Sequence, residues 1–194
     1  MKNSIKYLKM PLFIILASLF FTCSNTSEDF NSDLDAADLK EMARKPVMKY
    51  KAELNMLNNS GVWGMAELML DGDQLTVTIH AEGLEPDITH AQHIHGMTDN
   101  LGNSSCPPSK ADADGDGFVS VGEGLPFYGP VLLPLSPFST APGGMIDFQQ
   151  TYSLNSSLGP LQNRSIVLHG LNVNGGYVGS MPVACGQIMS DQGK

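Results

Sequence analysis

The chain has 194 residues, and 20 acidic against 11 basic side chains give it a formal net charge of −9 at pH 7. Its length suits one domain with a proper hydrophobic core. The acidity excludes nucleic acid as a partner, because phosphates would repel such a surface. Solubility accounts for most of the carboxylates, although a surface of this kind also attracts cations.

The N-terminal segment has the layout of an export signal. Three lysines precede an apolar run, from about Pro11 to Phe21, that is too short to span a bilayer comfortably. The run ends at Cys23, so residues 1–22 resemble a bacterial lipoprotein signal peptide with Cys23 as the lipidated residue. Phenylalanine at positions 20 and 21 leaves an ordinary cleaved signal as the alternative. On either interpretation the protein is exported, and without this segment its net charge is −12. The lipoprotein interpretation makes the lipid bilayer of the cell envelope a partner.

Residues 23–47 are polar and acidic, and we interpret them as a tether between the lipid and a folded domain. A short amphipathic helix that ends before Pro46 is the alternative.

From residue 48 to residue 190 the pattern predicts an all-β domain. Residues 47–57, 61–70 and 74–84 alternate apolar with polar side chains and are separated by N-N-S-G and D-G-D turns, which predicts a meander of three antiparallel strands. No segment in this region has a helical period. Later strands are expected in the following segments: 91–96, 129–135, 145–154, 164–171 and 184–189. Seven or eight short strands indicate an antiparallel Greek-key β-sandwich or barrel.

Residues 90–96 read H-A-Q-H-I-H-G and hold three of the five histidines. Side chains at i and i+2 of a strand project from one face, so His93 and His95 can reach a common point while Ile94 faces away. Neutral imidazoles suit copper, zinc, nickel or iron, and His169, which ends the apolar stretch SIVLH, is the natural third ligand. The alternative is that these histidines only pack.

The remaining candidates near these histidines are weaker. Packing or hydrogen bonding is the preferred interpretation for His80, and His90 could brace the loop by bonding to backbone groups. Met97 is near enough in sequence to be an axial ligand, but an ordinary packed methionine is the simpler interpretation.

The stretch D-A-D-G-D-G-F-V-S-V-G-E, residues 112–123, has the spacing of a calcium loop. The expected ligands are the side chains of Asp112, Asp114, Asp116 and Glu123 and the carbonyl oxygen of Phe118, with Ser120 acting directly or through water. A calcium ion would have a structural role in this insertion. A solvated acidic loop is the alternative, because no helix is expected on either side.

Cysteines 106 and 185 remain once Cys23 is assigned to lipid. An even pair in an oxidising compartment predicts one disulfide, and two unrelated buried thiols are the alternative.

Two stretches together resemble the copper/zinc superoxide dismutase family. They are L-T-V-T-I-H-A-E-G-L-E-P-D-I-T-H-A-Q-H-I-H-G, and R-S-I-V-L-H-G-L followed by V-A-C-G-Q-I. The resemblance implies that fold for residues 48–190, copper ligation by His93, His95 and His169, a structural role for His90, and a disulfide between Cys106 and Cys185. It also implies a small anionic substrate, superoxide.

The sequence departs from that family at two places. The region after Cys106 contains no histidine, so no zinc is expected there, and Pro182 stands where the family has an arginine that guides superoxide. A second resemblance is to the chordin-type (CHRD) domain, which has an A-H-I-H-G-like strand and a later G-P-V strand. The expectations are therefore a copper-binding, superoxide-dismutating protein, a copper protein without turnover, or a structural module of the cell envelope.

Overall fold

The computed structural model describes residues 45–154 and 158–191, and these form one unit. The predicted signal peptide, the lipidation site at Cys23 and nearly all of the tether lie outside the described residues. Within the described ranges, no helix is both long and apolar enough to cross a membrane.

Strands dominate the described chain, as the alternating sequence pattern predicts. The strands are β1 (Met48–Met56), β2 (Trp63–Asp71), β3 (Gln74–Glu82), β4 (Thr89–His90), β5 (Gln92–His95), β6 (Val131–Pro134), β7 (Ser139–Thr140), β8 (Met145–Ser153), β9 (Ser165–Val173), β10 (Gly176–Gln187) and β11 (Met189–Ser190). One helix, α2 (Val121–Tyr128), and four short 3-10 turns accompany them. The 3-10 turns are Thr98–Asn100, Ser109–Ala111, Pro142–Gly144 and Leu161–Asn163.

The first three strands form the predicted antiparallel meander. β1 pairs with β2 and β2 with β3, and the two-residue turn after Asp71 is made by Gly72, at φ 64°, and Asp73. Along β3, Leu75, Val77, Ile79 and Ala81 are almost wholly buried while the residues between them face outward. One face of the meander therefore packs into the core, which confirms this part of the sequence prediction.

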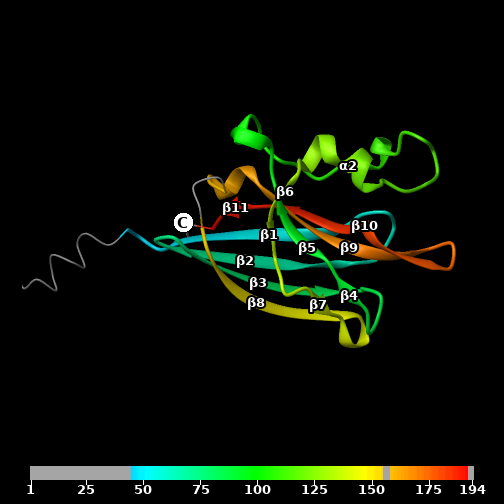
Figure 1. Ribbon diagram of the computed structural model, residues 1–194, viewed down its shortest axis with the longest axis horizontal. Coiled ribbons are helices and arrows are strands. Elements are labelled where there is room, and N and C mark those ends of the chain that lie inside the picture. Colours follow the sequence, from blue (N-terminus) through cyan, green and yellow to red (C-terminus); the bar gives the residue numbers. More distant parts are fainter. Residues whose placement is uncertain (1–44, 155–157, 192–194) are drawn as a thin grey trace, which may run out of the picture. The chain divides into compact units, whose positions relative to one another are not determined.

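A single curved sheet holds most of the strands, in the order β6-β5-β9-β10-β1-β2-β3-β8, with β11 paired to β1 (Figure 1). Every pairing described is antiparallel, and β4 and β7 form a separate small ladder. The all-β class is confirmed, whereas the Greek-key, superoxide dismutase-like topology stays a prediction.

Two strands differ in length from those expected. β9 runs past His169 to Val173, and β10 begins at Gly176, because a tight turn at Asn174 and Gly175, both with positive φ, joins them as a hairpin. β5 pairs with β9, with His93 opposite Val167 and His95 opposite Ser165. The two histidine-bearing segments, far apart in sequence, are thus hydrogen-bonded neighbours.

Helix α2 corrects the expectation that no helix follows residue 47. The Ser120 side chain accepts a hydrogen bond from the Glu123 N–H, and the Glu123 carboxylate accepts from the Ser120 N–H, which is a capping box. The helix could not be recognised in the sequence because it contains three poor helix formers, Gly122, Gly124 and Pro126. The local cap and packing against β10 outweigh that propensity.

The expected disulfide is confirmed, since Cys106 and Cys185 are bonded across 79 positions of sequence. It fixes the segment before the acidic loop to β10, and both sulfurs lie in a small cluster with Tyr128 and Val167.

Candidate metal centre

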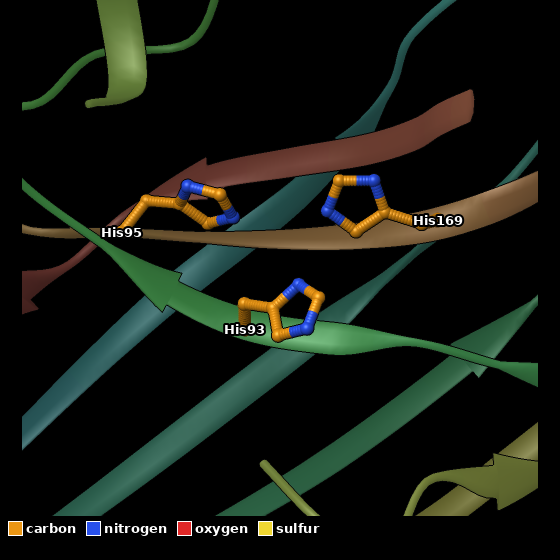
Figure 2. A group of neighbouring side chains, drawn as sticks. All are labelled: His93, His95 and His169. Carbon is orange, nitrogen blue, oxygen red and sulfur yellow. The ribbon is translucent and has the colours of Figure 1, made fainter. Parts of the chain in front are cut away.

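Three imidazoles converge on one side of the sheet. His93 and His95 project from β5 and His169 from β9, and Figure 2 shows their rings turned toward one another. The ring centroids lie 5.2 Å apart for His93 and His169, 5.6 Å for His93 and His95, and 5.8 Å for His95 and His169. One nitrogen of each ring lies within 4.8 Å of the other two, close enough for one ion to reach all three.

Backbone carbonyl groups fix the orientation of two of the rings. The Nδ1–H of His95 donates to the Gly129 carbonyl oxygen at 2.8 Å, and that of His169 donates to the Ser180 carbonyl oxygen at 2.8 Å. Each bond leaves Nε2 without a proton and with its lone pair free. These two Nε2 atoms and Nδ1 of His93 are buried and have no hydrogen-bond partner. Buried polar atoms are seldom left unpaired, so three at one place fit a metal ion as their missing partner.

Burial keeps these imidazoles neutral. It lowers the pKa of His93 to about 4, with repulsion from His95 as a smaller cause. Burial likewise lowers the pKa of His169 to about 4, although the bond to the Ser180 carbonyl acts in the opposite direction. The pKa of His95 is also lowered by burial. A neutral imidazole is the form that binds a metal, so the three donors are ready to bind at neutral pH.

The imidazoles line a hollow of about 380 Å³ that is otherwise mostly apolar. Its other lining residues are Ala91, Val121, Val131, Phe138, Gly179 and Ser180. No lysine or arginine is among the described residues that line it, and Pro182, directly opposite His169 in the β9–β10 pair, is buried and uncharged. The site thus offers neutral donors and no cation to attract an anion.

Helix α2 and the segments after it supply parts of the site that the sequence did not reveal. The ring of Tyr128 packs against His95 with centroids 4.7 Å apart, and its hydroxyl donates to the Val121 carbonyl oxygen. Phe138 stands edge-on to His93 at 5.3 Å. No spacing pattern in the sequence marks Tyr128 or Phe138 as part of a site. The position of a carbonyl group such as that of Gly129 depends on the path of the backbone, which the sequence pattern does not give.

The other candidates near the histidine-rich strand lie apart from this centre. His90 is fully buried, and its ring nitrogens lie 2.9 Å from the His169 carbonyl oxygen and 3.0 Å from the Glu85 carbonyl oxygen, as a bracing residue would. His80 is exposed and hydrogen-bonded to Asp147. Met97 does not line the hollow.

The acidic loop forms a second group of ligand atoms. One carboxylate oxygen each from Asp112, Asp114 and Glu123 lies within 4.8 Å of the others, whereas Asp116 is not in this group and accepts a hydrogen bond from the Phe118 N–H. Hydrogen bonds from the backbone of Ser120 and then Ala113 lower the pKa of Glu123 to about 2. Helix α2 starts at the tenth position of the loop. Calcium binding here stays a prediction.

Comparison with known proteins gives no match, since neither a family model nor a curated protein corresponds to the chain.

Proposed function

We propose that this protein binds one copper ion through His93, His95 and His169. The observation that supports this most directly is the convergence of three unpartnered, neutral imidazole nitrogens in one hollow. Copper(II) forms the strongest complexes of the first-row divalent metals with nitrogen donors, and no thiolate or carboxylate among the described lining residues favours another metal. Bound copper supplies one-electron redox chemistry.

Metal analysis of the purified protein tests this proposal. We expect one copper(II) per chain after loading and dialysis, and none in His93→Ala or His169→Ala. Met189→Ala is the matched control, since it removes an exposed side chain outside the hollow and should keep full copper content. Equal copper content in all four proteins would mean that the imidazoles only pack, as in a structural or interaction module of the chordin type.

The second candidate function is dismutation of superoxide, which rests on the sequence resemblance and on the open hollow beside the imidazoles. Two superoxide ions and two protons would give dioxygen and hydrogen peroxide, and the protons would come from water because no described acidic side chain lines the hollow. The lack of a cation among the described lining residues and the acidic surface predict a slow reaction, and its rate should fall when salt is lowered because repulsion of the anion is then less screened. Superoxide consumption by copper-loaded protein separates an enzyme from a copper-binding protein without turnover.

We further propose that calcium binds the acidic loop in a structural role. The support is the ligand spacing, the grouping of Asp112, Asp114 and Glu123, and the start of α2 within the loop. Calcium should raise the melting temperature of the purified protein and a chelator should reverse the rise. Asp114→Asn should abolish the response, and Asp99→Asn, outside the loop, should keep it. An unchanged melting temperature in the unmodified protein would leave only a solvated loop.

The proposed location is the cell envelope, with attachment to the bilayer through lipid on Cys23. This part rests on the sequence of residues 1–23 alone. Cys23→Ser should release the protein from the membrane fraction, and unchanged fractionation would favour another mode of attachment.

A further inference from the structure

The outer face of strands β2 and β3 carries an unexplained group of exposed and half-buried side chains. Trp63, the single tryptophan of the chain, is 60% exposed. It lines a hollow of about 360 Å³ together with Met65 and His80, and this hollow shares no lining residue with the three-imidazole site. A large aromatic ring that faces solvent on a strand contributes little to the core, so a ligand that covers it together with the half-buried thioether of Met65 is a natural reason for its position.

Strand register holds the three side chains together. Met65 stands directly opposite His80, and Trp63 precedes Met65 by two residues on the same face. Side chains directly opposite each other on one face of an antiparallel pair have Cβ atoms about 5 Å apart, within reach of a shared ion. The carboxylates of Glu53 and Glu82 line the same hollow and make it attractive to cations.

The side chain of His80 is oriented to act as a metal ligand through Nε2. Its Nδ1–H donates to the carboxylate of Asp147, which stands opposite it on β8. That bond fixes the ring and leaves the lone pair on Nε2, the arrangement in which carboxylate partners orient histidine ligands of metals.

We propose that Met65, His80 and Trp63 form a second, surface site that binds a monovalent soft cation, copper(I). A thioether and an imidazole prefer such an ion to hard divalent cations, and the face of an indole attracts a cation more strongly than any other aromatic side chain. The site does not depend on copper at the three-imidazole centre. Its exposure suits transfer of the ion to or from another molecule.

The single tryptophan makes the test direct, because all indole fluorescence reports on this face. The purified protein is titrated with silver(I), a stable stand-in for copper(I), and then with copper(I) under anaerobic conditions. We expect one equivalent to quench Trp63 emission and zinc(II) to leave it unchanged. His93→Ala should respond as the unmodified protein does, which separates this site from the three-imidazole centre.

Substitutions identify the ligands. Met65→Leu and His80→Gln should abolish the quenching by one equivalent, and Asp147→Asn should weaken it about 10- to 100-fold. Met69→Leu is the matched control, because Met69 is an exposed methionine on the same strand that stands opposite Thr76 and outside the hollow. Unchanged emission in the unmodified protein, normal quenching in Met65→Leu, or equal loss in Met69→Leu would each overturn the proposal. Because His80 and Asp147 are exposed and Met65→Leu keeps an apolar side chain of similar size at a half-buried position, the variants should fold, and circular dichroism verifies this.

Discussion

Acidification should barely weaken metal binding at the three-imidazole centre until the pH approaches 4. Protons compete with a metal for an imidazole lone pair only below the pKa of that imidazole. Burial lowers the pKa of both His93 and His169 to about 4, compared with 6.5 for an exposed histidine. Both side chains therefore stay neutral and able to bind over a range in which ordinary histidines take up protons.

The size of the effect follows from these values. At about pH 5.5, two histidines of ordinary pKa are both neutral in only about 1% of molecules, whereas two with a pKa of about 4 are both neutral in about 94%. From about pH 7.5 to 5.5, copper affinity should thus fall less than about two-fold, compared with about 100-fold for an ordinary pair. In the metal-free protein the unfolded state binds more protons between pH 6.5 and 4, so the free energy of unfolding should decrease as the pH falls through that range.

Competition with a chelator of known pH dependence measures the copper dissociation constant at both pH values. A peptide of residues 90–96 is the control, because its imidazoles are exposed and should lose affinity as ordinary histidines do. A loss of 100-fold or more in the folded protein would refute the reasoning, since the imidazoles would then be open to protons from solvent.

Three further predictions concern the scaffold. Replacing both Cys106 and Cys185 by alanine should lower the free energy of unfolding by about 4.5 kcal/mol, in the chain-entropy treatment of a bridge spanning 79 positions. Denaturant titration measures this loss, and a loss below about 1 kcal/mol would contradict that treatment. Gly129→Ala places a Cβ 2.4 Å from the Gly96 carbonyl oxygen, at a φ of 78°, so it should lower the free energy of unfolding by about 1–3 kcal/mol. It should also weaken copper binding about 10-fold, because it moves the carbonyl group that orients His95. Gly143→Ala, also at positive φ but with open space around it, should affect stability alone, and equal copper affinity in the two variants would argue against the orienting role of Gly129. Ile94→Ala removes a fully buried side chain between the two ligands of β5, so it should lower the free energy of unfolding by about 2–5 kcal/mol while leaving the copper content unchanged. Loss of copper in a folded variant would mean that the two faces of β5 are not independent.

The strands and the ligand candidates could be predicted because their cause is local. Burial of one face of a strand imposes a period of two on the sequence, which is visible in β3. The H-x-H of β5 was recognisable for a related reason, since side chains two residues apart leave the same face of a strand. Local pattern does not say which strands become neighbours. The proximity of His169 to β5 follows from the β5–β9 pairing, which depends on the whole sheet.

The parts that the sequence did not predict have physical reasons of their own. Helix α2 depends on a two-residue cap and on tertiary packing, so its glycines and proline suggested a loop. The groups that orient His95 and His169 are backbone carbonyls, and every residue has one. Only the course of the chain determines which carbonyl group lies beside a given ring.

The pairing of β5 with β9 has a consequence for the life of the protein in its compartment. Both ligand-bearing strands belong to a sheet whose hydrogen bonds and core need no ion, unlike small domains that fold only around a metal. The protein without copper should therefore stay folded, and bound copper would stabilise it further. Copper supply, and not turnover of unfolded chains, would then determine how many molecules are occupied.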